Sequence, residues 1–166
     1  MSCPPEPPDR AAGPIIDPDV DLHDPAQRGP ALPAVLAAIA AGGILGAEAR
    51  YGLSRALPHR PDSFAWSTLL INLTGCLLIG VLMATLLQLP RPHSLARPFL
   101  GTGILGGYTT YSTFALDALQ LVRAHRPGPA AGYLVATVLG CAVAVWLAAT
   151  LTERAWQARR VPAESA

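Results

Sequence analysis

Charged residues are scarce in this 166-residue chain, and lysine is absent altogether. Only 14% of the residues are charged, all 12 basic residues are arginine, and 51% of the residues are hydrophobic. With a mean hydropathy of +0.36, this composition excludes an ordinary soluble protein and indicates residence in a membrane. The formal net charge of +1 gives no indication of a nucleic-acid partner.

Cysteine and histidine are too few and too scattered for a metal or redox centre. Cys3, Cys76 and Cys141 show neither metal-binding nor redox spacing. The last two lie in apolar runs, where a thiol acts as a small hydrophobe. The four histidines, at positions 23, 59, 93 and 125, fall in the head or in loops, and we expect them to be solvated. No nucleophile with a matching base appears, so an enzyme is not expected.

The first 30 residues lack the apolar content that folding requires. They hold eight prolines, and their six acidic residues outnumber two arginines. This composition predicts a disordered acidic head over residues 1–30. The head also lacks the basic start and apolar centre of a signal peptide.

Four long apolar runs follow the head, each near the length of about 20 residues that a membrane-spanning helix needs. They cover residues 31–53, 64–89, 98–122 and 130–151. The short connections carry helix breakers, in PHRPD at 58–62, PRPH at 90–93 and RPGP at 126–129. We therefore expect an all-α membrane protein, with a four-helix domain over residues 31–152 and a polar tail over residues 153–166.

Arginine is divided almost evenly between the two sides of such a bundle. Six arginines near the spans fall on the side of the termini and four on the other side, which is a weak bias for orientation. This balance permits an inverted pair of identical subunits. Small residues that allow close helix packing occur in the first two spans: Gly42, Gly43, Gly46, Gly75 and Gly80.

Polar residues at membrane depth are few, and most of them have two interpretations. Asn72, in LINLTG, either forms an interhelical hydrogen bond or coordinates an ion. Arg50, in GAEARYG, is either a snorkelling interfacial residue or a positive charge that concentrates anions at a pore mouth. Asp117 is either an interfacial acid or a mouth residue, and Glu48 is expected at the interface.

The third run contains the most unusual stretch, GILGGYTTYSTFALD at residues 103–117. Its glycines at 106–107 and threonines at 109–110 predict a break in the helix at mid-membrane. Broken backbone at that depth is tolerated only where it is buried in protein or lines a cavity. Tyr111 and Phe114 then share a helical face, where they either pack in the core or line an anion path with their positive ring edges. The fourth run has a polar ladder on one face, for packing or for ion contact: Tyr133, Thr137 and Cys141.

Three segments, in order along the chain, resemble the signatures of the Fluc (CrcB) fluoride channel family. They are GGILGAEARYGLS, STLLINLTGCLLIG and GTGILGGYTTYSTFALD, and the resemblance covers roughly residues 31–152. It implies a dual-topology antiparallel dimer of four-helix subunits, formed by two copies of this chain or with a paralogous partner. It also implies two fluoride-selective pores along the dimer interface and a structural Na⁺ on the twofold axis.

The same resemblance implies a role for each polar residue. The backbone carbonyls of Gly106 and Thr109 would hold the Na⁺. The rings of Tyr111 and Phe114 would line each pore together with the amide of Asn72. Ser112 and Thr113 would supply hydroxyls beside the rings. Tyr133 and Thr137 would form the polar track of the fourth span. Arg50 and Asp117 would lie in the vestibule.

Three positions depart from the pattern of the family. Tyr111 stands where a phenylalanine is usual, and its hydroxyl alters the place of the ring in the ion path. Cys141 replaces a hydroxyl residue, which weakens one end of the polar track. Asp117 is one methylene shorter than the usual glutamate.

The role implied by the resemblance is passive export of fluoride, which accumulates when its neutral acid enters the cell and ionises. Such a channel needs sites that attract the ion and still release it. Two other classes stay open. A proton-coupled drug exporter of this size needs an acid deep in a span, and Glu48, near the end of one, is its only candidate. A non-transporting membrane assembly subunit leaves the broken third span unexplained.

Overall fold

The structure of the chain is a computed structural model that describes residues 30–60 and 62–160. The predicted head, apart from Pro30, lies outside the described residues, as do the last six residues of the predicted tail. Cys3 and the first histidine of the chain lie in the part that is not described.

All regular structure in the described ranges is helical, as the sequence predicts. Three helices are long and apolar enough to cross a membrane: α1 (Leu32–Ala56), α2 (Trp66–Gln88) and α5 (Pro127–Arg160). Shorter pieces lie between α2 and α5: the π-helix η1 (Arg97–Leu105), α3 (Gly106–Tyr108) and α4 (Ser112–Arg123). The expected third span is therefore divided where its glycines and threonines predict a break.

The breakers at 126–129 do not form the predicted loop. α5 begins at Pro127, because proline lacks only an N–H that the first helical turn does not use. The turn comprises residues 124–126 instead. In it His125 has a φ of 57°, and the Arg126 N–H donates to the Leu121 carbonyl at 3.0 Å, which closes α4 as a Schellman turn does.

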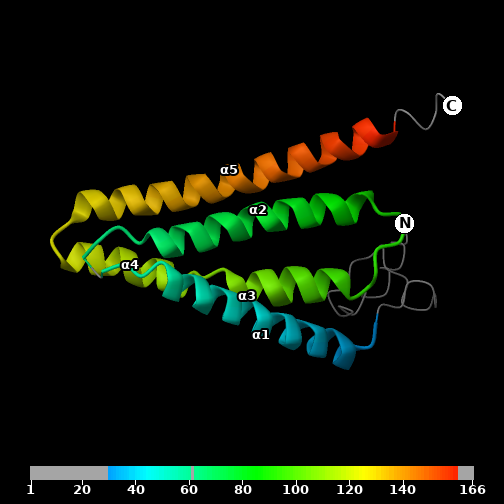
Figure 1. The fold of residues 1–166 in the computed structure, drawn as a ribbon, viewed down its shortest axis with the longest axis horizontal. Helices are drawn as coiled ribbons and strands as arrows, with labels where there is room; N and C mark the ends of the chain where they lie inside the picture. The colour runs from blue at the N-terminus through cyan, green and yellow to red at the C-terminus, as the bar shows by residue number, and fades with distance from the viewer. Residues whose placement is uncertain (1–29, 61, 161–166) are drawn as a thin grey trace, which may run out of the picture.

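Two groups of packed helices make up the fold (Figure 1). α2 lies along α5, and α1 lies along η1 and α3. α4 follows the break and packs mainly against α5. The connection between α1 and α2 and the turn before α5 meet at the same end of the molecule, where Arg126 donates to the Asp62 carbonyl at 2.7 Å.

Glycines allow α1 to pack backbone to backbone against η1 and α3. A Cβ atom on Gly46 would lie 2.1 Å from the Ile104 carbonyl oxygen, and one on Gly42 would lie 2.4 Å from that of Phe99. The predicted close approach is also confirmed in α2, where a Cβ atom on Gly80 would lie 2.7 Å from the Val145 carbonyl oxygen and one on Gly75 would meet the side chain of Thr109. The backbone of Gly43 also packs closely against Gly107 of α3, although the Cβ direction of Gly43 itself is open.

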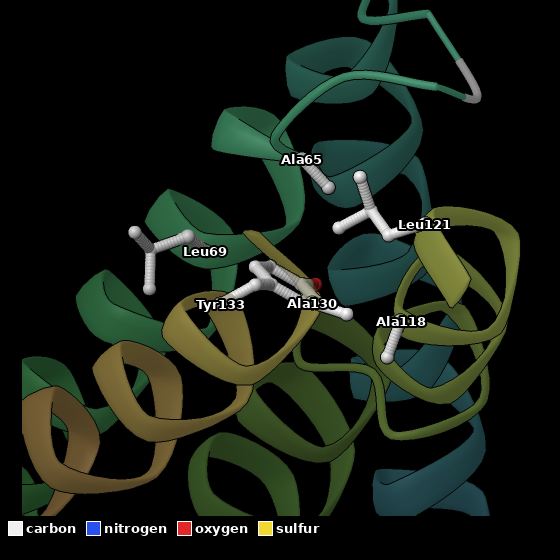
Figure 2. Close-up of a cluster of buried hydrophobic side chains, with 6 residues drawn as sticks. All are labelled: Ala65, Leu69, Ala118, Leu121, Ala130 and Tyr133. Carbon is white, nitrogen blue, oxygen red and sulfur yellow. The ribbon is translucent and has the colours of Figure 1, made fainter. Parts of the chain in front are cut away.

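The main cluster of buried apolar side chains lies near the end of the molecule where the two connections meet (Figure 2). Tyr133 of α5 is fully buried there. Phe64 and Phe114 are partly buried and pack against the cluster. The six residues of the cluster come from the start of α2 with the residue before it, from α4 and from α5: Ala65, Leu69, Ala118, Leu121, Ala130 and Tyr133.

Large apolar side chains on the outer faces of the helices stay exposed in the single chain. They include Leu36, Ile44, Leu78, Val138 and Trp146. So much apolar surface is unfavourable in water and suits lipid or a second protein chain.

Replacing Gly46 with alanine should destabilise the protein, because the added methyl group forces α1 away from the backbone of η1. Overpacking of this kind costs about 1–3 kcal/mol. The effect is measured as the midpoint of thermal unfolding in detergent, with size-exclusion chromatography as the readout. Gly43→Ala is the matched control and should retain the wild-type midpoint, and equal midpoints for the two variants would contradict the described packing.

Candidate functional site

The side chain of Asn72 holds the break between α3 and α4. Its Nδ2 donates to the Thr110 carbonyl at 3.0 Å, and its Oδ1 accepts from the Thr110 N–H at 2.9 Å. Both residues are buried. One amide on α2 thus satisfies both backbone groups of a residue that is outside any helix, where an unpaired group would be costly. Of the two interpretations of Asn72, a structural hydrogen bond is therefore present, although it joins α2 to the break and not to another helix. One hydrogen of Nδ2 takes no part in it.

This arrangement withdraws two backbone carbonyls from helical bonding. In a continuous helix the Thr110 N–H would bond to the Gly106 carbonyl, and the Thr113 N–H to the Thr109 carbonyl. Here the first N–H donates to Asn72, and the second donates to the Thr110 hydroxyl at 3.2 Å. The two carbonyls are the ones predicted to hold Na⁺. Carbonyl oxygens at an unwound helix are suitable Na⁺ ligands, so the donor set fits the ion.

Thr110 is a site residue that the sequence pattern indicated only as part of the break. Its hydroxyl donates to Thr113 Oγ1 at 3.0 Å and lies 3.4 Å from Ser112 Oγ. From a position one residue before the N-cap Tyr111, it also accepts the Thr113 N–H at the start of α4, and so satisfies a backbone donor of the first helical turn. The sequence signal for this role is a threonine that stands three residues before Thr113, near the start of a helix.

Arg50 points to the break instead of remaining on the outside of α1. Its Nε–H donates to the Gly107 carbonyl at 3.2 Å. The guanidinium therefore occupies a third carbonyl of the break, which lies between Gly106 and Thr109 in sequence, and places a positive charge there. Glu48, two residues earlier, is exposed, and its place at the membrane interface stays a prediction.

A groove of about 340 Å³ brings together most of the residues predicted to form the ion path. Tyr111, one of the residues that line this groove, is 81% exposed. The centre of its ring lies 5.9 Å from the centre of the Phe114 ring. Thr137 is buried, and its hydroxyl donates to the Tyr133 carbonyl of its own helix at 2.8 Å. The lining comes from α2, the break, α4 and α5: Asn72, Cys76, Thr109, Thr110, Tyr111, Phe114, Thr137, Val138 and Cys141.

Several predicted path residues lie outside this lining. Ser112 and Thr113 stand at the start of α4, the first exposed and the second half-buried. Tyr133 lies in the apolar cluster (Figure 2), with its ring centre 5.4 Å from that of Phe114. Its part in an ion path stays a prediction.

Asp117 is buried in a polar network beside that cluster. Its carboxylate accepts from Thr68 Oγ1 at 2.6 Å and from the Tyr133 hydroxyl at 3.4 Å, and it lies 3.4 Å from His59 Nε2. The expectation that His59 is solvated is wrong, because its other ring nitrogen lies 2.8 Å from Ser67 Oγ and its side chain is only 21% exposed. The other two described histidines are exposed, as expected.

Comparison with known proteins places the chain in a family. Residues 37–149 match the family described as CrcB-like protein, Camphor Resistance (CrcB). The chain belongs to this family. The matched range includes every residue of the break, the groove and the network around Asp117. With three helices suited to crossing a membrane, this CrcB-like chain is a multi-pass membrane protein.

Relatives within the family cover most of the chain. It is similar to a protein of Thermobifida fusca named fluoride-specific ion channel FluC 2, with 51% identity over 76% of this chain and 96% of the relative. A Streptomyces coelicolor protein named fluoride-specific ion channel FluC 1 is 45% identical over 76% of this chain and 79% of its own length. A Pseudomonas putida protein named fluoride-specific ion channel FluC is 39% identical over 72% of this chain and 97% of its own length.

Replacing Asn72 with leucine should destabilise the break, because it leaves the buried N–H and carbonyl of Thr110 without their partners. Each unsatisfied group costs about 1–3 kcal/mol. We expect a lower midpoint of thermal unfolding and faster hydrogen exchange over residues 106–113. Thr150→Val is the control, because the Thr150 hydroxyl bonds to carbonyls of its own helix. Wild-type exchange in Asn72→Leu would show that the amide does not hold the break.

Proposed function

We propose that this CrcB-like chain forms a passive, fluoride-selective ion channel of the cell membrane. The names of its relatives support fluoride as the transported ion. The observation that carries the proposal is the groove, which joins an amide, an unwound backbone and two aromatic rings. A channel carries out no chemical conversion, so this protein is not an enzyme.

The lining of the groove suits a small, strongly hydrated anion. Passage requires that protein groups replace the water shell of the ion without holding it too tightly. Asn72 offers its remaining N–H, and the ring edge of Phe114 carries partial positive charge. The Thr137 hydroxyl already donates to a carbonyl, so this hydroxyl must turn before it can donate to an anion. The lining contains no carboxylate, which favours passive anion flow over the proton-coupled exporter.

The open groove and the exposed ring of Tyr111 favour a second copy as the missing wall. Four crossings, with η1, α3 and α4 together as the third, put both termini on one side. The nearly even arginine distribution then permits an inverted partner, so that two grooves are closed in an antiparallel dimer. A paralogous partner with the same fold would serve equally.

The Gly106 and Thr109 carbonyls of both subunits would hold a structural Na⁺ at the dimer centre. When bound, the ion supplies positive charge that offsets the carbonyl dipoles of the break. Arg50 adds a second positive charge through the neighbouring carbonyl. In this arrangement Arg50 and Asp117 flank the path, and Ser112 and Thr113 provide hydroxyls beside the rings.

Fluoride efflux from reconstituted vesicles, recorded with a fluoride electrode, tests this function. Wild-type protein should release fluoride without a proton gradient and should not release chloride. Phe114→Ile should slow efflux roughly tenfold or more, a barrier increase of about 1.4 kcal/mol, because it removes the polar ring edge. Phe99→Ile, a matched change outside the groove lining, should retain wild-type efflux. Absence of wild-type efflux, or efflux that requires protons, would contradict the proposal.

A further inference from the structure

His59 connects the loop after α1 to α2 and α4. One ring nitrogen lies 2.8 Å from Ser67 Oγ, and the other lies 3.4 Å from Asp117 Oδ1. One hydrogen-bond pattern fits both contacts of the neutral ring. Nε2–H donates to the carboxylate, and Nδ1 accepts from the serine hydroxyl. When protonated, the ring donates from both nitrogens, and the serine oxygen then accepts.

In the part of the chain that the structure describes, the Asp117 carboxylate has one neighbour that can compensate its charge when it is ionised. The residue is 6% exposed, and burial of a carboxylate is costly unless the charge is paired. Thr68 and Tyr133 donate neutral hydrogen bonds to it. Of the described residues, His59 is the one that forms an ion pair with Asp117 when it is protonated.

The other charged groups described near this end have other partners or are exposed. Arg60 pairs with Asp62 at 3.1 Å on the surface. Arg126, at the turn before α5, donates to the Asp62 carbonyl. Arg55 at the end of α1 and Arg123 at the end of α4 are exposed. The histidine therefore controls the net charge of the pair, which is −1 with a neutral ring and zero with a protonated ring.

This pair lies one helical turn from the groove. Thr68 precedes Asn72 by four residues on α2, and Tyr133 precedes Thr137 by four on α5. Residues four apart are neighbours on a helix face. Tyr133 also contacts Phe114 of the groove lining. The carboxylate that His59 contacts is thus held by residues that support the groove.

We propose that His59 is a proton-responsive positioning residue that sets the net charge of its pair with Asp117 at one end of the ion path. This inference rests on the proposed fluoride channel. With a neutral ring, the net negative charge opposes fluoride. Histidine changes its charge between about pH 5 and pH 8, and the partly exposed ring can exchange protons with water. Protonation cancels the charge and keeps the carboxylate in place, so fluoride conduction rises as the pH falls.

Fluoride efflux at equal pH on both sides of the vesicle tests the proposal. Between about pH 8 and pH 5.5, wild-type efflux should increase by about three- to tenfold, after subtraction of leakage from protein-free vesicles. His59→Gln keeps a hydrogen-bond donor for Asp117 but cannot be charged, so its efflux should stay near the wild-type value at about pH 8 throughout this range. His125→Asn is the matched control at the same end, since asparagine tolerates positive φ, and it should retain the wild-type pH response.

The outcomes separate the two proposals. Wild-type efflux with an unchanged pH response in His59→Gln overturns the role of His59 and leaves the channel intact. Absence of wild-type efflux at every pH overturns the channel and this inference with it. If His59→Gln does not assemble, His59→Asn takes its place, because asparagine also keeps an amide donor and cannot be charged. A lost pH response in His59→Asn supports the proposal, and the full wild-type response overturns it.

Discussion

The pairing of the Asn72 side chain with the backbone of Thr110 is the interaction on which the rest of the site depends. A helix interrupted at membrane depth leaves polar groups that lipid cannot satisfy. One amide from α2 satisfies two of them, and the Thr110 hydroxyl satisfies a third. The carbonyls of Gly106 and Thr109 then face no helical N–H. The same bonds bring α2, the break and α4 together as walls of one groove.

The surrounding fold fixes this interruption from two sides. On one side, glycines let α1 approach the backbone of η1 and α3, and Arg50 reaches the Gly107 carbonyl. On the other side, α2 and α5 pack along their length and carry Asn72 and Thr137. One helical turn from the groove, Tyr133 belongs to the apolar cluster and also donates a hydrogen bond to Asp117. The break is therefore held by packing and by polar bonds, and neither alone explains it.

Residue patterns predicted the features that depend on local chemistry. The apolar runs predicted α1, α2 and α5, and the paired glycines and threonines predicted the break. The patterns could not show which side chains meet across helices. The burial of His59 depends on an aspartate 58 positions away, and the open direction at Gly43 depends on how α1 is rotated. α5 also continues to Arg160, past the apolar run, because a helix needs no apolar side chains once it leaves a membrane.

We propose that Asn72 holds an open break whose carbonyls bind an ion between two inverted copies. An experimental structure of the protein in lipid nanodiscs with Na⁺ tests it most directly. We expect Asn72 bonded to Thr110, non-helical backbone between α3 and α4, and ion density shared by the Gly106 and Thr109 carbonyls of two antiparallel subunits. A continuous helix through the third span, with Asn72 turned to lipid and no ion at those carbonyls, would contradict the account.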